Sequence, residues 1–293
     1  MRILTVLSLL AAWKSIASVI SRIVDLPDQS LNNATLWRRV MKLPPSNAAN
    51  VMKDYIMDET GPDSSAYDTV WRVGPADDPS DVNTSVYSEL KSERSFVATM
   101  LQGCTVLAII SRKGVYIGHY WENIAFATDN DFLLKYETQK KAFEETVLKG
   151  LRDGIKDEWE PQEMVQESLT EFASKYADDH IYAYLIRPRI AYNQDYPGEQ
   201  DDVEKIDGYP KEWQDMKDLV LKLIPKLEDP DRWKTRIYDA TDDKKTLKED
   251  TNGRVLFKFD PEHRLPTDRR GKPTRLTKLW LERREIHSDE WTD

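Results

Sequence analysis

The chain contains a single cysteine and four histidines, and one of each lies in a short segment that is typical of a β-hairpin. Cys104 opens an apolar run that continues to Ile110, and His119 lies in a second apolar run over residues 115–121. Residues 111–114, Ser-Arg-Lys-Gly, lie between the two runs and favour a turn. A thiol and an imidazole held side by side form a nucleophile and a base that can attack an amide.

The residue numbers indicate whether two antiparallel strands would place both side chains on the same side. Opposed residues share a face, and an even-length loop pairs residues whose numbers sum to an odd value. Cys104 and His119 satisfy this condition. A loop centred on residues 111–112 opposes them directly, whereas a loop centred on residues 113–114 places His119 at a diagonal position or one pair further away. An odd-length loop reverses the parity unless a bulge restores it.

Gly103 and Thr105 flank the thiol and are predicted to lie beside the site. Gly103 leaves room for a substrate carbonyl to approach main-chain N–H groups, which could serve as an oxyanion hole. An imidazolium beside the sulfur would lower the thiol pKa. The alternative is that Cys104 is a buried core residue without a chemical role, because free cysteine is among the most buried residue types.

The order and spacing of Gly103-Cys104-Thr105 and His119 on two consecutive strands resemble the catalytic hairpin of the cytotoxic-necrotising-factor and chemoreceptor-deamidase group of glutamine deamidases, over about residues 95–125. This group includes bacterial toxins that act on Rho-type GTPases. The chain has Val106 where the toxins usually carry a second hydroxyl residue, and Ala98 where some relatives carry a threonine that positions the histidine. The group that orients His119 is therefore unassigned, with Glu122 as a local candidate if the strand ends before it.

The resemblance implies a secreted Cys-His enzyme that deamidates glutamine or asparagine side chains of a protein target, as a toxin or effector does. Cys104 would attack the carboxamide carbon, and His119 would protonate the departing ammonia and then activate water. An amine in place of water would make the same site a transglutaminase, and another kind of thiol hydrolase is a further possibility. The competing hypothesis is a non-enzymatic secreted effector or surface-binding protein in which Cys104 belongs to the core.

The 293 residues carry a net charge of −10, and 40% of them are hydrophobic, which is typical of a folded globular protein. An acidic chain does not favour a broad nucleic-acid-binding surface. The pattern predicts an α+β fold, in which a central antiparallel or mixed sheet, sandwich-like, carries inserted amphipathic helices. Helices are expected over residues 36–41, 48–57, 129–153, 161–176 and 211–224. Further strands are expected over residues 180–186, 235–238, 254–259 and 276–286, and residues 94–100 are expected to form either a strand or a short helix that leads into the hairpin.

Residues 1–17 are predicted to be a secretory signal peptide, because Arg2 precedes an apolar run and small residues follow it. The alternative for this segment is an amphipathic first helix. Residues 18–85 contain several turn clusters and are predicted to form an irregular N-terminal segment, either a wrap around the core or a pro-region. Residues 86–293 are predicted to form the catalytic-like α+β domain.

Asn33 and Asn83 begin N-glycosylation sequons, which suit a secreted glycoprotein. No other stretch approaches the ~18 apolar residues of a membrane span. The remaining histidines lack metal-ligand spacing, and no metal or cofactor is implied. Residues 264–284 are rich in arginine and lysine, and they are expected to form a solvated loop and strand or a docking patch for an acidic partner or lipid.

Overall fold

The computed structural model describes residues 43–61, 68–69, 83–156, 164–189, 208–266 and 271–293. The strands of these residues form two sheets, one of seven strands and one of five. In spatial order the larger sheet contains β6 (Ile155–Lys156), β7 (Met164–Gln166), β2 (Thr84–Glu89), β5 (Gly114–Tyr120), β4 (Thr105–Ile110), β8 (Tyr182–Pro188) and β9 (Trp233–Tyr238). The smaller sheet contains β1 (Asp68–Thr69), β3 (Arg94–Ala98), β10 (Val255–Arg264), β11 (Thr274–Leu281) and β12 (Arg284–Thr292).

The seven-stranded sheet is mixed, because β2 runs parallel to β7 and β8 runs parallel to β9, while its other neighbours are antiparallel. The smaller sheet is antiparallel apart from the two-residue β1, which pairs with β3 in parallel. The α+β fold with a mixed sheet, predicted from the sequence, is confirmed.

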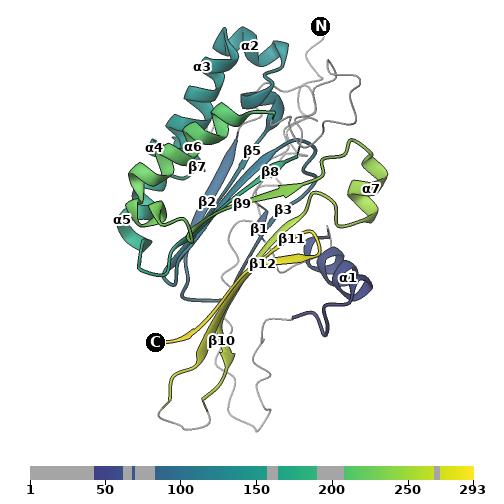
Figure 1. Ribbon diagram of the computed structural model, residues 1–293, viewed down its shortest axis with the longest axis vertical. Helices are drawn as coiled ribbons and strands as arrows, with labels where there is room; N and C mark the ends of the chain where they lie inside the picture. The colour runs from purple at the N-terminus through teal and green to yellow at the C-terminus, as the bar shows by residue number, and fades with distance from the viewer. Residues whose placement is uncertain (1–42, 62–67, 70–82, 157–163, 190–207, 267–270) are drawn as a thin grey trace, which may run out of the picture. The chain divides into compact units, whose positions relative to one another are not determined.

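The two sheets pack face to face over a shared apolar core (Figure 1). Strand residues alternate between this core and the outer faces, as the two-residue period of a strand requires. On β4, for example, Val106 and Ala108 belong to the inter-sheet core, whereas Leu107 and Ile109 pack on the helical side. The central strands β4 and β5 are buried throughout, since they have cover on both faces.

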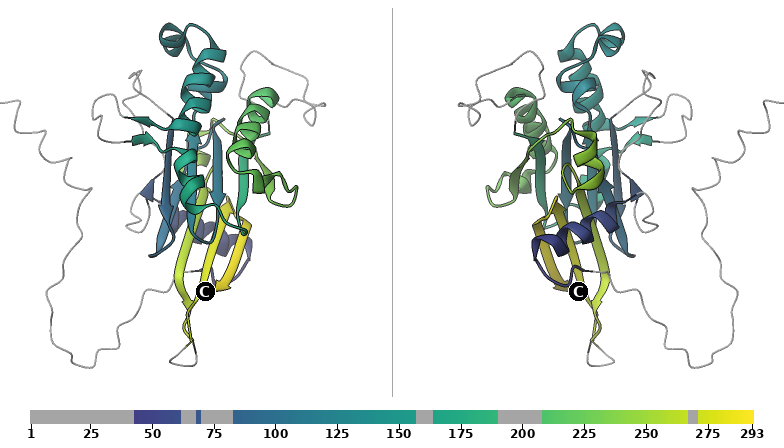
Figure 2. Two further views of the ribbon diagram at one scale, coloured as in Figure 1. Left: turned by 90° about the vertical axis from the view of Figure 1, so that its left-hand side faces the viewer. Right: turned by 90° about the vertical axis from the view of Figure 1, so that its right-hand side faces the viewer.

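The helices form the outer layers of the sandwich (Figure 2). One group packs on the outer face of the seven-stranded sheet, and it comprises η1 (Glu122–Phe126), α2 (Asn130–Tyr136), α3 (Gln139–Phe143), η2 (Glu144–Leu148), α4 (Lys149–Asp153), α5 (Leu169–Tyr176), α6 (Pro210–Leu223) and η4 (Pro225–Glu228). The short α7 (Lys244–Glu249) lies between β9 and β10 in the chain. The helix α1 (Ala49–Thr60) packs on the outer face of the five-stranded sheet.

Three predicted elements are corrected by the structure. The helix expected over residues 129–153 is interrupted because Glu137 has a positive φ of 67° and Thr138 caps a new helix by accepting a hydrogen bond from Lys141 N–H. Part of the helix expected over residues 161–176 is the strand β7, and the helix α5 starts only after its N-cap Ser168. The strand expected over residues 276–286 is two strands, β11 and β12, joined at Glu282, whose φ is also positive.

The segment of residues 18–85 is not irregular throughout, because α1 is a regular helix with a buried face. Met52, Tyr55 and Ile56 pack against Val97 and Trp280 of the five-stranded sheet. This helix therefore packs on the sheet through a small apolar cluster of its own, on the face opposite the core between the two sheets. Whether it is a wrap or a pro-region stays a prediction. The helix expected over residues 36–41 lies outside the described residues.

In its described part, the basic stretch of residues 264–284 is mostly strand, and several of its side chains form ion pairs. Arg264 pairs with Glu290, Lys278 with Glu285, and Arg275 with Asp293. Exposed pairs of this kind add little stability, but they neutralise the charge that a docking patch would need. Among the described residues, no helix is long and apolar enough to cross a membrane.

Candidate functional site

The β4–β5 hairpin places Cys104 and His119 on the same face of the sheet, as the residue numbers predict. Val106 pairs with His119, and Thr105 pairs with Tyr120. This register centres the turn on Arg112-Lys113, between the two loops considered above, and the hydrogen bond from Ser111 N–H to the Gly114 carbonyl closes it. If this pairing is continued by one residue, Cys104 lies diagonal to His119. The Cβ atoms of two residues in such a diagonal position are about 7 Å apart.

Both side chains lie at one end of the inter-sheet core and are almost completely covered. Cys104 is 5% exposed and His119 is 1% exposed. Burial raises the pKa of the Cys104 thiol to about 11. Burial also lowers the pKa of the His119 imidazole to about 3. Both shifts favour the neutral forms, so this closed arrangement holds a thiol and a neutral imidazole instead of the thiolate–imidazolium pair.

The His119 ring has no hydrogen-bond partner on either nitrogen among the described residues, Cys104 included. Its nearest aromatic neighbour is Trp121, at 5.0 Å between ring centroids, and the indole Nε1 of Trp121 is likewise buried without a partner. Three unpaired polar atoms therefore lie close together at the end of β5, beside the start of the strand that carries the thiol. Buried polar groups are normally paired, and such a cluster is a feature of sites that meet a ligand.

His287 provides a comparison, because it is also buried in the core between the sheets, with 6% exposure. Its Nδ1 lies 2.8 Å from the Tyr184 hydroxyl and its Nε2 lies 3.1 Å from the Thr277 hydroxyl. This histidine has the two partners that a structural imidazole requires. His119 therefore lacks both of the partners that His287 has. Nδ1 of the half-buried His263 is also buried without a partner, but among the described histidines only His119 has both ring nitrogens buried and unpaired.

We expect leucine substitutions to affect these two histidines with opposite signs. His119→Leu removes two unpaired nitrogens and should raise the free energy of unfolding at pH 7 by about 1–2 kcal/mol. His287→Leu leaves two buried hydroxyls unpaired and should lower it by about 1–3 kcal/mol. Urea-induced unfolding of the full chain measures both values. A loss of stability at His119 comparable to that at His287 would contradict the interpretation that His119 is unsatisfied in the folded state.

The sulfur of Cys104 has polar surroundings on its main-chain side. The main-chain N–H groups of Glu122, Gly103 and Gln102 face it and oppose the rise in the thiol pKa that burial causes. Tyr238 donates a hydrogen bond of 2.8 Å to the Cys104 carbonyl and so fixes the start of β4 against β9. An array of N–H groups around a nucleophile can also stabilise the oxyanion that forms when it attacks a carbonyl.

Glu122 follows the end of β5 and points back toward Gly103. The strand ends at Tyr120 and η1 begins at Glu122. The direction of the Glu122 side chain is therefore not set by the alternation of side chains along β5. A Cβ atom at Gly103 would collide with the Glu122 carboxylate, so a side chain at position 103 would displace that carboxylate from its present place. The Tyr209 hydroxyl donates a hydrogen bond of 2.7 Å to Oε1 of Glu122. Glu122 does not orient His119, since neither ring nitrogen has a partner.

The side chain of Thr105 does not belong to the site, which corrects the sequence-based expectation. Its hydroxyl accepts a hydrogen bond of 3.0 Å from Trp213 Nε1, on the helical side of the sheet. The alternation along β4 turns it away from the face of Cys104 and His119. Thr105 therefore anchors α6 to the sheet.

The glycosylation expected at Asn83 does not fit the folded chain. Asn83 is fully buried, and its Nδ2 donates to the carbonyl and the hydroxyl of Thr146, both at 3.2 Å. Its Oδ1 accepts a hydrogen bond of 2.8 Å from Trp121 N–H. This asparagine joins η2 to the segment that follows His119, and a glycan has no room there. Asn33, like residues 1–17, lies outside the described residues.

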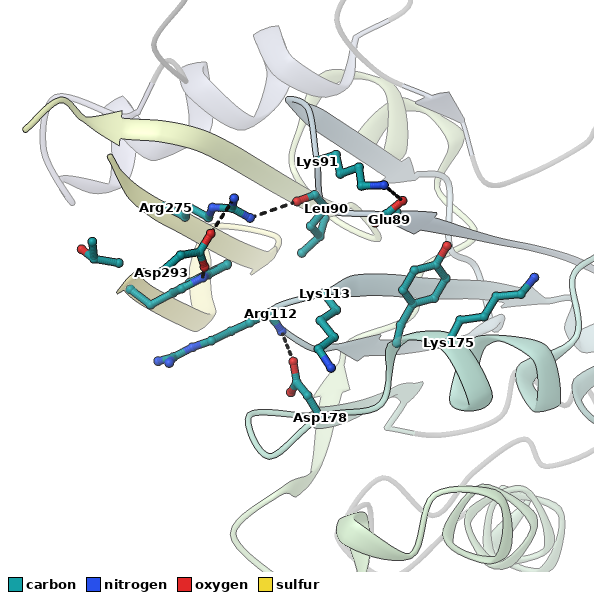
Figure 3. A pocket seen from close by; sticks show the side chains of 12 residues that line it. Glu89, Leu90, Lys91, Arg112, Lys113, Lys175, Asp178, Arg275 and Asp293 are labelled. Carbon is teal, nitrogen blue, oxygen red and sulfur yellow. Dashed lines mark hydrogen bonds and ion pairs between the residues drawn. The ribbon is translucent and has the colours of Figure 1, made fainter. Parts of the chain in front are cut away.

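A pocket of about 490 Å³ opens at the other end of the hairpin (Figure 3). It is separated from Cys104 by the length of β4, about 20 Å at the usual rise per residue. Its charged lining residues are Glu89, Lys91, Arg112, Lys113, Lys175, Asp178, Arg275 and Asp293.

Most of the cations in this pocket are already compensated. Arg112 pairs with Asp289, Lys91 with Glu89, and Arg275 with Asp293. Lys175 forms a further pair with Glu171. The Arg112 guanidinium also lies over the Trp291 ring, at 5.4 Å from its centroid. Balanced charges of this kind give the pocket no strong preference for an anion.

In the described part of the chain, no group of three or more His, Cys, Asp or Glu side chains could hold a metal ion. No protein-family model matches the chain, and neither a curated protein nor a solved structure matches it significantly. The resemblance to the deamidases therefore depends on the Cys104–His119 hairpin, and the function has to be argued from the geometry of the site.

Tyr209 is a site residue that the sequence did not single out. It precedes α6 and reaches Glu122 across a separation of 87 positions. No local pattern connects two residues so far apart. The glycine before the cysteine was the available signal, because a glycine at the entrance of a buried strand often marks the close approach of another group.

Proposed function

We propose that Cys104 and His119 form a thiol amidohydrolase site that acts on glutamine or asparagine side chains of a protein. The observation that supports this proposal is the His119 imidazole, buried without a partner and on the same face as the thiol. A core histidine gains nothing from such an arrangement, whereas a base that must exchange protons with a substrate needs free nitrogens.

The reaction follows from the groups present. The sulfur forms a bond to the carboxamide carbon while its proton passes to His119, and the main-chain N–H groups at Gly103 and Glu122 stabilise the oxyanion. The C–N bond then breaks, and ammonia leaves with the proton from His119. Water attacks the thioester with His119 as the base, which yields a carboxylate and the free thiol. A primary amine in place of water would give transamidation by the same steps.

The pKa values describe a closed form of this site. Proton transfer from a thiol with a pKa of about 11 to an imidazole with a pKa of about 3 costs roughly 10 kcal/mol. Because burial causes both shifts, entry of water or of a polar substrate returns each pKa toward its ordinary value. The proposal therefore requires that the end of the sandwich beside Cys104 opens locally in the native chain, without global unfolding, so that water and a substrate side chain can enter.

The competing function is a surface-binding protein or effector in which Cys104 is part of the core. The observation that favours it is the 5% exposure of Cys104, together with the separate pocket beside Trp291. In both cases we propose secretion, on the basis of residues 1–17 alone, and a protein as the partner.

Thiol labelling separates the two functions, because the chain has one cysteine and each labelled molecule reports on Cys104. If the site is catalytic, iodoacetamide should label the native chain faster than the chain unfolds globally, and His119→Ala should slow the labelling. Synthetic peptides with glutamine or asparagine should release ammonia, and His119→Ala should lower that rate by about 10²–10⁴-fold. Methylamine added to the reaction distinguishes a transglutaminase from a deamidase.

Cys104→Ala is the control for ammonia release that does not depend on the site. Labelling at the rate of global unfolding, with no ammonia from any peptide, would support the binding protein and exclude the enzyme.

A further inference from the structure

The position of Glu122 bears on which substrates the Cys104 site can accept. Its carboxylate occupies the space that a side chain at position 103 would fill, directly beside the residue that precedes the nucleophile. Tyr209 holds this carboxylate in place with a hydrogen bond of 2.7 Å to Oε1. The main-chain N–H of the same residue faces the sulfur. Glu122 thus contributes a donor and a negative charge to one site.

The negative charge of Glu122 shifts the pKa values of neighbouring groups. Burial is the largest cause of the raised pKa of Cys104 and of Tyr209, and the negative charge of Glu122 is a further cause of both shifts. An interaction of this kind is strong when water is excluded, because the effective dielectric constant is low. A second negative charge brought to the sulfur would be repelled in the same way, whereas a neutral group with N–H donors would be attracted.

We propose that Glu122 is a specificity-determining residue that admits a neutral primary carboxamide to Cys104 and excludes a carboxylate. This inference rests on the proposed function. The carboxylate accepts a hydrogen bond from the amide NH₂ and places the carbonyl oxygen on the side of the main-chain N–H groups. It also repels the carboxylate product of deamidation, so that hydrolysis is followed by release.

Two alkylating reagents of nearly equal shape test this inference without a known substrate. Iodoacetamide carries a neutral primary carboxamide, and iodoacetate carries a carboxylate in its place. The ratio of their rates at Cys104 in the native chain is divided by the ratio for the same cysteine in urea, which removes the intrinsic difference between the reagents. We expect the native chain to favour iodoacetamide by about tenfold or more on this scale.

Glu122→Gln keeps the shape of the side chain and removes its charge, and it should bring the corrected ratio close to one. Tyr209→Phe keeps the charge and removes its anchor, and it should give an intermediate ratio, which supports the inference even if Glu122→Gln folds poorly. Glu145→Gln is the matched control, because this residue is exposed on η2 and should leave the ratio unchanged.

The outcomes distinguish the two proposals. Native labelling that depends on His119, with the same ratio in Glu122→Gln as in the unchanged chain, would overturn the role of Glu122 and leave the thiol site standing. Labelling that occurs only at the rate of global unfolding would overturn the enzymatic site, and the role of Glu122 with it. A ratio that collapses in Glu122→Gln and persists in Glu145→Gln supports the inference.

Discussion

Lowering the pH from 7 to 5 is expected to reduce the free energy of unfolding by about 4 kcal/mol through His119 and His287 alone. Both imidazoles are buried, and burial lowers their pKa values to about 3 and about 4. In the unfolded chain they titrate near 6.5. Between pH 6.5 and pH 4 the unfolded state therefore binds protons that the folded state does not, and stability falls as the pH falls. Each histidine contributes about 2 kcal/mol by pH 5.

The measurement is urea-induced unfolding of the full chain at both pH values, with the two leucine variants as controls. Each of His119→Leu and His287→Leu should remove about half of the pH dependence, although the two substitutions have opposite effects at pH 7. Glu167 and Glu282, whose pKa values are raised by burial, act in the opposite direction in all variants, so the differences isolate the histidines. A pH dependence unchanged in His119→Leu would show that this imidazole is accessible to protons in the folded state.

The hairpin that carries the site was predictable because its determinants are local. Two apolar runs flank a polar four-residue turn, and the parity of Cys104 and His119 follows from their numbers for any even loop. The centre of the turn was not predictable, since residues 111–112, 112–113 and 113–114 all lie in a sequence that favours a turn. The structure selects the middle pair because Ser111 and Gly114 close the loop.

The interrupted helix after residue 129 shows where sequence periodicity fails. Phe132, Phe143 and Val147 are buried, as their spacing predicts, but the helix stops at Glu137 and restarts at Thr138. Thr138 favours the restart because it is a good N-cap, but no residue at position 137 announces the break, since a positive φ is uncommon for glutamate. The apolar stripe is therefore preserved while the helix axis changes.

The direction of the Cys104 pKa shift could not be predicted from the sequence, for a different reason. An imidazole beside a thiol suggests a lowered thiol pKa, but the structure gives a raised one, because burial outweighs the neighbouring groups. The partners that decide this balance come from η1 and from the residue before α6, which the chain brings together only in three dimensions. The same property makes the proposed enzyme dependent on a local opening of the site.

Breaking the buried ion pair between Lys258 and Glu59 is expected to have the largest effect of any single substitution in the N-terminal part of the fold. Lys258 lies on β10 and Glu59 near the end of α1, and their side chains are 4% and 10% exposed. Glu59→Leu leaves an uncompensated ammonium under α1 and should lower the free energy of unfolding by about 3–5 kcal/mol. The double variant Glu59→Leu/Lys258→Met removes both charges and should recover most of that loss.

Urea-induced unfolding of the full chain tests this prediction, with Glu145→Gln as the exposed control. Glu145 pairs with Lys149 at the surface, and its loss should cost at most about 1 kcal/mol. Equal small losses at Glu59 and Glu145 would mean that α1 lies loosely on the sheet and that residues 18–85 can act as a removable segment. A large loss at Glu59 that the double variant repairs would mean that α1 is part of the folded core, because its removal would expose Val97, Leu256 and Trp280 on the outer face of the sheet.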